Sequence, residues 1–478
     1  MVNITVTNSL CQIQNHPDWL HKELTKKLRY MDQNVEFAYR GNVKAIKRLN
    51  DLLGAGKFSR SSEAKESLEK QLRHKLHVQR GLEEKLWCPL YDDEGYFPTG
   101  LLPYVHYILE ESRVHYEVID ERIKPEKQIK FILKETFPPL RYYQKEAYRK
   151  LSEQHRGVVE MPTGTGKSLT AARMIWELGL PTLIITPGKS LTDQMTKTLV
   201  KHFGKGKVKK LTTKDVKLKT INVVNIQALV NMDPKIFKDI RLAMIDEFHH
   251  AAADTYLAVN EEHLSECYYR IGFTATNFRN DGAELALRSV LSEVLHQYSI
   301  QQAIEDGFLM KPEFVEVPIR LDKEKTYQTA YKKQIVQNKK RNQLVKEIAE
   351  DHPDDAVIIL VKQVAHGELL KKMLPDAEFI HGEIKDGDRE KVMEKFRKGQ
   401  IKRLIGTSVI GEGVDLPVAR VLILAAGGKA RGQVMQNIGR VLRLHPDKDT
   451  PIIYDFTDED GSWLESHSEA RFEVYDMY

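Results

Sequence analysis

The sequence is poor in the features that mark disulfide-rich, zinc-binding and membrane-spanning proteins. Only three cysteines, Cys11, Cys88 and Cys267, occur in 478 residues, and their wide spacing gives neither a disulfide framework nor a metal site. No apolar run is long enough to cross a bilayer, and the N-terminus lacks the apolar core of a signal peptide. We therefore expect free thiols in a reducing compartment and a soluble, cytoplasmic protein without a membrane partner.

The chain also lacks a strong overall charge. Its formal net charge is only +5, so composition alone does not indicate a nucleic-acid partner. Positive charge is nevertheless concentrated in two segments. Arg40–Arg80 contains eleven Lys and Arg against four Asp and Glu, which fits either a helical arm that contacts DNA or an exposed pair of charged helices. Lys201–Lys210 either follows a phosphate backbone or forms a solvated hairpin between strands.

Apolar runs and turn residues divide the chain into three regions. Residues 1–135 alternate strand and helix patterns and are predicted to form a smaller α+β accessory DNA-binding domain with a basic helical insert. Residues 136–310 and 311–478 each alternate short apolar runs with helical patterns, which is typical of parallel sheets covered on both faces. We therefore predict an α/β protein with two parallel-sheet lobes that are joined by a hinge.

The individual elements follow from the same patterns. In the N-terminal region the predicted strands are 3–7, 86–91 and 114–119, and the predicted helices are 17–31 and 103–112. The predicted strands of the first lobe are 157–159, 181–186, 220–224, 242–246 and 270–274. Those of the second lobe are 356–361, 378–381, 403–407, 420–425 and 451–455, after a charged helical connector over 323–351. The acidic segment 458–461 lacks the spacing of a calcium loop and is predicted to be an ordinary loop.

Residues 160–168 form the most informative stretch, because Glu-Met-Pro-Thr-Gly-Thr-Gly-Lys-Ser stands between an apolar run and a helical pattern. A strand, a glycine-containing loop and a helix in this order are typical of a phosphate-binding loop. Met161 stands where the general pattern has its first glycine. The predicted ATP contacts are Thr163, Gly164, Thr165, Gly166, Lys167 and Ser168. Lys167 would reach the β- and γ-phosphates, and the Ser168 hydroxyl would bind Mg²⁺.

Two further groups of charged residues complete a candidate site for ATP hydrolysis. Asp246 and Glu247 end the fourth apolar run of the first lobe, where Asp246 can bind Mg²⁺ and Glu247 can orient and deprotonate the attacking water. Arg440 and Arg443 lie three residues apart, and so on one helix face. From there they could neutralise charge that develops on the γ-phosphate. Gln436, on the same predicted helix, is expected to join them.

The order of these motifs resembles that of the superfamily 2 helicases over residues of about 137–460. The matching segments are Leu140–Gln144 (Q-type motif), Pro162–Ser168 (motif I), Thr186–Leu191 (Ia), Asp246–His249 (II, in the DExH form), Thr274–Thr276 (III), Gly406–Pro417 (V) and Gln436–Arg443 (VI). The resemblance implies two RecA-like lobes with ATP and Mg²⁺ in the cleft between them. The residues that it assigns to nucleotide are Arg141, Gln144, Gly413 and Asp415. Those that it assigns to the nucleic-acid strand are Thr186, Pro187, Gly188, Lys189, Thr407 and Ser408.

Within this superfamily the chain is similar to the XPB-like helicases and the UvsW-type branch-migration helicases of phages. Asp246–Ala251 and Thr274–Gly282 carry this similarity, although Asn280 stands where the XPB-like group has an acid. Tyr96–His106 resembles the N-terminal module of small phage and restriction-type DExH proteins, whereas the basic insert resembles no family. His249 is expected to couple the ATP and nucleic-acid sites.

The resemblance implies a DExH-type ATP hydrolase that unwinds or branch-migrates forked and junction DNA in replication, recombination or repair. It would act on DNA as a monomer in the cytoplasm, which is the host cytoplasm if a phage encodes it. Three alternatives stay open. They are the motor subunit of a restriction or defence system, an RNA helicase, and a nucleic-acid-stimulated ATPase that remodels proteins.

Overall fold

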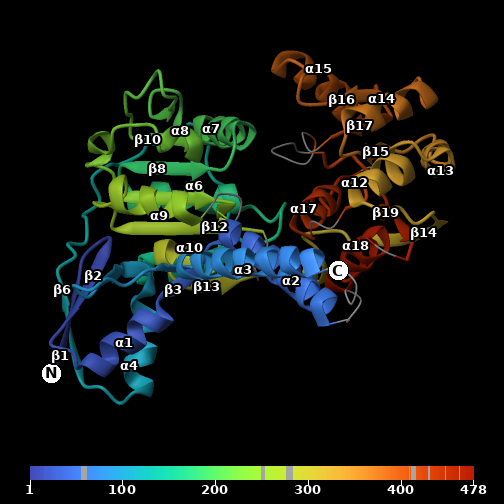
Figure 1. Cartoon of the computed structure of the whole chain (residues 1–478). Helices are drawn as coiled ribbons and strands as arrows, with labels where there is room; N and C mark the ends of the chain where they lie inside the picture. Colours follow the sequence, from blue (N-terminus) through green and yellow to red (C-terminus); the bar gives the residue numbers. More distant parts are fainter. Residues whose placement is uncertain are drawn as a thin grey trace.

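The computed structural model describes residues 1–54, 62–248, 253–275, 284–407, 410, 416–428, 431–446, 448–461 and 463–478. Figure 1 shows an N-terminal module (blue), a first lobe around a seven-stranded sheet (green to yellow) and a second lobe around a six-stranded sheet (orange to red). The predicted fold class, two parallel-sheet lobes after a smaller α+β region, is confirmed. The boundaries after residues 135 and 310 stay predictions. None of the helices in the described residues has the length and apolarity that a membrane crossing requires.

The N-terminal module is built on a four-stranded sheet of order β5-β2-β1-β6. Its strands are β1 (Val2–Val6), β2 (Leu10–Gln14), β5 (Tyr96–Pro98) and β6 (Tyr116–Asp120). Alternate residues of β1 are buried, and α1 (Asp18–Lys27) and α4 (Leu102–Glu111) pack in the same core. The prediction of one helix over 17–31 is wrong at its end. Pairing between β3 (Arg29–Met31) and β4 (Trp87–Pro89) overrides the local helical preference there.

Two long helices leave the module between β3 and β4 and form a hairpin, which we call the arm. They are α2 (Gln33–Gly54) and α3 (Ser62–Lys85), and they correspond to the predicted basic helical insert. The buried Asn42 amide donates to the Lys75 carbonyl (2.8 Å) and to Gln79 Oε1 (3.0 Å). Tyr39 donates to Glu83 farther along (3.3 Å), so the two helices run antiparallel. In Figure 1 the arm extends from the first lobe towards the second.

The N-terminal module is docked tightly on the first lobe. Gly100, in η1 (Thr99–Leu101), lies so close to α10 (Glu284–Leu291) that a Cβ would come within 2.3 Å of the Arg288 and Ser289 carbonyl oxygens. Arg270, buried in the first lobe, donates to Ser9 Oγ (2.6 Å), and the buried Arg156 donates to the Asn8 carbonyl. Close backbone packing and buried hydrogen bonds therefore fix the interface between the N-terminal module and the first lobe.

Residues 121–137, which we call the strap, connect β6 to the first lobe and run along it. The Gln128 and Ile129 N–H groups both donate to the Gly179 carbonyl (3.0 and 2.9 Å), and the Lys134 N–H donates to the His202 carbonyl (2.7 Å). Phe131 is buried in the core of the first lobe. The strap thus covers the ends of α6 (Lys167–Leu178) and α7 (Lys189–Phe203).

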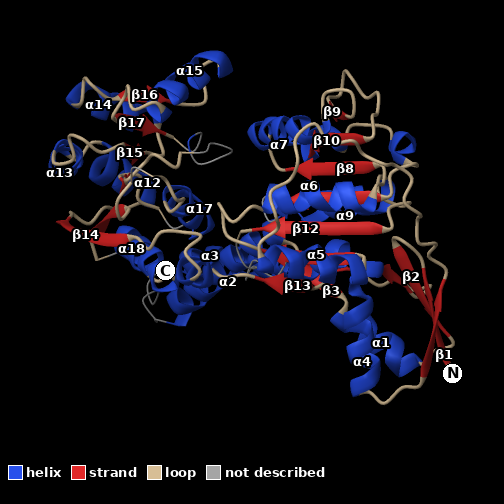
Figure 2. Ribbon diagram, turned by 180° about the vertical axis from the view of Figure 1, so that it is seen from behind, coloured by secondary structure: helices blue, strands red, loops and turns tan. Residues whose placement is uncertain are grey.

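The sheet of the first lobe is wholly parallel, in the order β13-β7-β12-β11-β8-β10-β9. Its strands are β7 (Arg156–Glu160), β8 (Thr182–Thr186), β9 (Val208–Lys210), β10 (Ile221–Asn225), β11 (Leu242–Asp246), β12 (Tyr269–Thr274) and β13 (Val294–Gln297). One face is covered by α5 (Tyr142–Gln154), α6 and α7, and the other by α8 (Ile226–Leu229), α9 (Ala253–Glu262) and α10. Figure 2 shows these layers from behind. The remaining helices are η2 (Pro234–Phe237) and α11 (Ile300–Glu305). All five predicted strands are present, whereas the short edge strands β9 and β13 were not predicted.

The basic segment Lys201–Lys210 does not form a hairpin, which was one of the two alternatives left open for it. It comprises the end of α7, a turn and the edge strand β9, which pairs in parallel with β10. Lys201 pairs with Glu135 (3.1 Å), Lys209 with Asp215 and Lys210 with Asp193. Because acidic neighbours balance these three cations, the segment is explained by local structure.

The sheet of the second lobe is also parallel, in the order β14-β19-β18-β15-β17-β16. Its strands are β14 (Glu313–Arg320), β15 (Val357–Leu360), β16 (Glu378–Ile380), β17 (Arg403–Gly406), β18 (Val421–Leu424) and β19 (Ile452–Glu459). Its helices are α12 (Tyr327–Ala330), η4 (Tyr331–Val336), α13 (Lys339–Glu350), α14 (Val364–Met373), α15 (Asp386–Arg397), α17 (Arg431–Val441), α18 (Trp463–Phe472) and η5 (Tyr475–Met477). The predicted strands and the helical connector are present. Only β14, an edge strand that contains Pro318, was missed.

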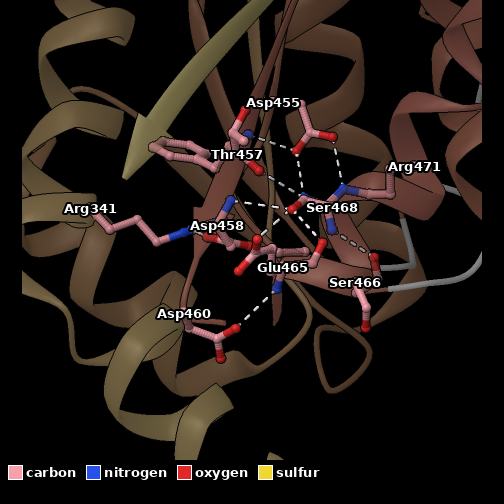
Figure 3. A network of polar contacts seen from close by, with 12 residues as sticks. Arg341, Asp455, Thr457, Asp458, Asp460, Glu465, Ser466, Ser468 and Arg471 are labelled. Carbon is pink, nitrogen blue, oxygen red and sulfur yellow. Dashed lines mark hydrogen bonds and ion pairs between the residues drawn. The ribbon is translucent and has the colours of Figure 1, made fainter. Parts of the chain in front are cut away.

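The predicted loop at 458–461 is wrong in its first half, because Asp458 and Glu459 end β19. Figure 3 shows why the acidic residues are here. Asp458 is buried against Arg341 of α13, and Asp455 accepts hydrogen bonds from Arg471 of α18 at 2.7 and 3.1 Å. Two buried Arg–Asp pairs therefore fasten helices on either side of β19 to the sheet. Each charge has an opposite partner, as burial requires.

Candidate nucleotide site between the lobes

A pocket of about 500 Å³ lies between the phosphate-binding loop of the first lobe and α17 of the second. Loops at the carboxyl ends of β7, β8 and β11 form one wall, which is where open parallel sheets bind ligands. The predicted residues that line this pocket are Thr163, Gly164, Gly166, Lys167, Ser168, Pro187, Gly188, Asp246, Glu247, Arg440 and Arg443. The fold therefore brings residues that are up to 280 positions apart in the sequence, from Thr163 to Arg443, into one site.

The phosphate-binding loop depends on two glycines with left-handed backbone conformations. Gly164 and Gly166 have φ values of +93° and +94°, which side chains rarely tolerate. A Cβ on Gly166 would also come within 2.4 Å of Gln144 Nε2. The helix α6 begins directly after this loop, at Lys167. Its N-terminus adds the positive potential that attracts phosphate groups.

Arg141 and Gln144 lie behind the phosphate-binding loop. The Gln144 side chain donates to the Thr165 carbonyl (2.9 Å) and accepts from the Arg141 N–H (3.0 Å). The Tyr143 hydroxyl donates to the same Thr165 carbonyl (2.8 Å), and the Arg141 guanidinium lies 3.9 Å from the centre of the Phe308 ring. The Q-type segment therefore holds the loop in place. Its predicted adenine contact stays a prediction.

Two neighbouring carboxyl groups meet one ammonium group in the pocket. Lys167 Nζ lies 3.1 Å from Glu247 Oε1 and donates to the Met161 carbonyl (3.1 Å). Glu247 has a φ of +47°, an unusual conformation for a non-glycine residue. Its side chain accepts from the Ala275 N–H (3.2 Å). Glu247 is thus held from the phosphate-binding loop on one side and from the end of β12 on the other.

The side chains of Asp246 and Ser168 fit a bound magnesium ion. Burial, and the negative charge of Glu247, raise the pKa of Asp246 to about 7, although Lys167 opposes this shift. Negative charge is therefore in excess at this point, and a divalent cation would relieve it. Mg²⁺ is usually bound by one or two carboxylates together with substrate phosphates and water. Asp246 and the Ser168 hydroxyl line the same pocket and supply oxygen ligands of this kind.

The second wall is the helix α17, which approaches the phosphate-binding loop closely. Gly439 of α17 packs on Thr163, and Arg443 packs on Gly164. The prediction that Arg440 and Arg443 share one helix face is wrong, because α17 ends at Val441 and Arg443 pairs with the linker instead. The linker between the lobes is joined to the same helix end, because Leu309 forms a β-bridge with Arg443 and the Met310 N–H donates to the Leu442 carbonyl (2.8 Å). Backbone contacts therefore define where α17 lies relative to the loop.

Lys448 is a residue of this wall that the sequence analysis missed. Its side chain is buried, and its ammonium group donates to the carbonyls of Val441 (2.7 Å), Arg443 (2.5 Å) and Pro417 (2.7 Å). Two of these carbonyls lie at the C-terminal end of α17, where a positive charge is favourable. A lysine a few residues after the two predicted functional arginines was the available signal.

The remaining predicted residues lie elsewhere or outside the described structure. Thr165 is buried within the loop, where its hydroxyl donates to the Pro162 carbonyl (2.7 Å). Thr186 is buried, with its hydroxyl 2.7 Å from that of Thr192, whereas Lys189 is exposed at the start of α7 and Thr407 directly follows β17. Their nucleic-acid roles stay predictions. Outside the described residues or side chains lie His249, Thr276, Asn280, Ser408, Gly413, Asp415 and the side chain of Gln436.

Comparison with protein families assigns both walls of the pocket to helicases. The family described as "Type III restriction enzyme, res subunit" matches residues 137–279, and the "Helicase conserved C-terminal domain" matches residues 339–445. The chain belongs to the superfamily 2 helicases. The two matched segments contain the residues that line the two walls of the pocket.

This helicase is similar to named relatives over about two thirds of its length. It is 23% identical to the DNA 3'-5' translocase XPB2 of Sulfurisphaera tokodaii, over 66% of this chain and 80% of the relative. It is 25% identical to the ATP-dependent DNA helicase uvsW of Enterobacteria phage T4, over 67% of this chain and 68% of the relative. The chain spans about half the length of other curated relatives that it matches.

A solved structure with a similar fold is a fragment of an HsdR subunit of a type I restriction enzyme from Vibrio vulnificus YJ016. The TM-score is 0.55 at 20% identity, and the likeness covers 74% of this chain and 70% of that one. This likeness concerns the fold alone, and it supports the arrangement of two parallel-sheet lobes.

Proposed function

We propose that this helicase is a DExH-type DNA motor that unwinds or branch-migrates forked and junction DNA in replication, recombination or repair. The single observation that carries the motor function is the pocket that joins Lys167, Asp246 and Glu247 of one lobe to Arg440 and Arg443 of the other. A site divided between two lobes can change shape when nucleotide is bound and released. The choice of DNA rests on the printed names of XPB2 and uvsW.

Hydrolysis would begin with an exchange of partners at Lys167. Its ammonium group pairs with Glu247 in the described structure, and the β- and γ-phosphates of ATP would draw it away. Glu247 would then be free to accept a proton from water as the water oxygen attacks the γ-phosphorus. The bond between that phosphorus and the β–γ bridging oxygen breaks, which releases ADP and phosphate.

Asp246 and Ser168 would hold Mg²⁺, which supplies positive charge to the phosphate oxygens when it is bound. An ionised carboxylate is the required ligand, so binding of Mg²⁺ would displace the proton that the raised pKa favours on Asp246. Thr163, Gly164, Thr165 and Gly166 would surround the phosphates, with Arg141 and Gln144 on the side of the adenine. Gly413 and Asp415 are proposed to complete the nucleotide contacts.

The second lobe would stabilise the transition state. Arg440 of α17 and Arg443, two residues after the end of this helix, line the pocket. Their guanidinium groups would neutralise charge on the transferred phosphoryl group. Gln436 is proposed to assist them. Because the two arginines come from the opposite lobe, hydrolysis would proceed only when the lobes are closed, and reopening would move one lobe along the DNA.

The proposed contacts with the DNA strand are Thr186, Pro187, Gly188, Lys189, Thr407 and Ser408. Pro187 and Gly188 line the nucleotide pocket itself, so they stand between the two sites. The N-terminal module, proposed as the domain of residues 1–135, would bind the duplex part of the substrate, and a monomer would suffice.

An unwinding assay on a panel of substrates tests this function. We expect ATP-dependent strand separation or branch migration with forks and four-way junctions, weaker action on blunt duplex, and none on an RNA duplex. ATP turnover should rise when DNA is added. Unwinding of the RNA duplex alone would replace DNA with RNA as the substrate. Stimulation of turnover without any strand separation would instead indicate a remodelling ATPase.

A restriction or defence motor is the second candidate. The family description matched by residues 137–279 and the fold likeness to an HsdR fragment favour it. In such a system the motor moves along duplex DNA beside a nuclease partner. Translocation that displaces a triplex-forming strand from intact duplex, without unwinding forks, would favour this candidate over the first.

A further inference from the structure

The arm carries a one-sided stripe of positive charge on α2. Arg40, Lys44, Lys47 and Arg48 are all exposed, and their spacing places them on one face of the helix. The residues that pack towards α3, such as Asn42, fall on the opposite face. Asp51 is the acid on the charged face, and Arg40 pairs with Glu36 one turn earlier. We call this surface the α2 stripe.

A second stripe lies on α3. Lys70, Arg73, His74, His77 and Arg80 are exposed and recur at intervals of three and four residues. Glu66 lies on the same face. Gln79, which meets Asn42, is buried on the opposite face. Each stripe therefore points away from the contact between the two helices. As a result, the arm presents positive charge on two opposite flanks.

The arm is built as a stiff support for these charges. The bonds from Asn42 to Lys75 and Gln79 fix the register of the two helices at its middle. With 22 residues, α2 is about 33 Å long. That length is close to one turn of a B-form duplex, roughly 34 Å. The α2 stripe, from Arg40 to Arg48, covers about 12 Å of this length, and the α3 stripe, from Lys70 to Arg80, covers about 15 Å. One stripe can therefore contact the phosphates of one duplex over a little less than half a helical turn.

We propose that the arm lies between two duplexes of a branched DNA and binds a phosphate backbone on each flank. The proposal deepens the proposed function and rests on it, because it names the structural class of substrate that the N-terminal module selects. A linear duplex can occupy only one flank at a time. A fork or a four-way junction offers two duplexes that diverge from one point, and so it can occupy both flanks at once.

Two stripe variants and one matched control test the proposal. The first carries Gln at Arg40, Lys44, Lys47 and Arg48, and the second carries Gln at Lys70, Arg73 and Arg80. The control carries Gln at Lys323, Lys325, Lys332 and Lys339, which are exposed in the second lobe. Gln is a good helix former, so the hairpin should keep its fold. Helical content and the thermal midpoint are measured for all three.

The readout is the affinity for a labelled four-way junction and for a linear duplex of equal length, from 50 to 200 mM salt, without ATP. We expect the wild-type chain to prefer the junction. Either stripe variant should lose most of this preference, while linear-duplex affinity falls less because the other flank remains. For the junction, the slope of log K against log salt should decrease by about 0.9 for each lost phosphate contact. The control should match the wild type.

Three results would overturn the proposal. They are unchanged junction affinity in both stripe variants, equal loss on junction and linear duplex, and a control that behaves like the stripe variants. A failure of the proposed motor function would be seen differently. In that case no DNA would raise the rate of ATP turnover by the wild-type chain. The two failures are distinguishable, because the binding measurement involves no hydrolysis and the turnover measurement involves no stripe variant.

Discussion

Lys167 is the residue at which the described structure and the proposed reaction meet most directly. Its ammonium group is shared between Glu247 and the Met161 carbonyl, so the future base is neutralised before ATP arrives. The left-handed backbone at Glu247 adds local strain. Contacts from the phosphate-binding loop and from Ala275 maintain this conformation. A carboxylate held in this way is prepared for reaction yet inactive without nucleotide.

Glu247→Gln should lower ATP turnover by roughly 10²- to 10⁴-fold, the usual effect of losing a general base. ATP affinity should be equal or slightly tighter, because the amide no longer competes with the phosphates for Lys167. Turnover at saturating DNA and the binding of a fluorescent nucleotide are the two measurements. Near-normal turnover would remove Glu247 from the role of base.

Lys448→Met keeps the length of the side chain and removes its charge. The carbonyls of Val441, Arg443 and Pro417 would lose their donor, and the free energy of unfolding should fall by about 1–3 kcal/mol. Because α17 would then be held less firmly, turnover should fall at least tenfold, while ATP affinity changes little. Lys448→Arg should restore part of the turnover. The exposed Lys325→Met serves as the control, and equal turnover in both Met variants would show that Lys448 does not position the arginines.

At the scale of elements, the sequence predicted the interior strands of the two lobes but missed three of their four edge strands, β9, β13 and β14. The fourth edge strand, β16, was predicted. Val357–Leu360 and Leu242–Asp246 are continuous apolar runs, since central parallel strands are buried on both faces. In contrast, Glu313–Arg320 alternates and contains a proline, because it is an edge strand that is half exposed. Asp458 is predicted to lie in a loop because its ion-pair partner, Arg341, is 117 residues away. No local sequence pattern indicates such a pair.

Gly100 is the point at which one element limits the placement of another. A methyl group at this position would lie 2.3 Å from two carbonyl oxygens of α10, and backbone cannot move away as a flexible side chain can. Gly100→Ala should therefore loosen the N-terminal module and lower the unfolding free energy by about 1–3 kcal/mol. Thermal unfolding and the rate of proteolysis in the strap are the measurements. Gly206→Ala, which meets nothing within 4 Å, should leave both unchanged.

At the scale of the whole molecule, the sequence predicted individual residues of the candidate site but not the contacts that hold them together. Lys167, Asp246 and Arg440 were found from local motifs, each of which carries its own signal. Their common pocket depends on contacts such as Leu309 with Arg443, which have no sequence pattern. The same holds for Arg270 and Ser9, 261 residues apart, which join the N-terminal module to the first lobe.

The contacts between the N-terminal module and the first lobe predict how stable truncated chains are. Removing residues 1–135 takes away the strap as well as the partners of Arg156 and Arg270, and it opens the core at Phe131. Removing only residues 1–120 keeps the strap. We expect both chains to be less stable than the full chain, with the longer deletion clearly the worse in thermal midpoint. Equal midpoints would mean that the strap contributes nothing to the first lobe.

In each of the three large sheets the first strand of the unit lies beside its last one. The pairs are β1 with β6, β7 with β13 and β14 with β19. During synthesis on the ribosome, none of these sheets can therefore be completed before the end of its own segment has emerged. The phosphate-binding loop follows β7, and the neighbours of this strand, β12 and β13, are synthesised after it. Arg440 and Arg443 on the second wall of the pocket are synthesised later still. An unfinished chain would hold no assembled pocket, so the proposed hydrolysis of ATP could not begin before the N-terminal module and both lobes are complete.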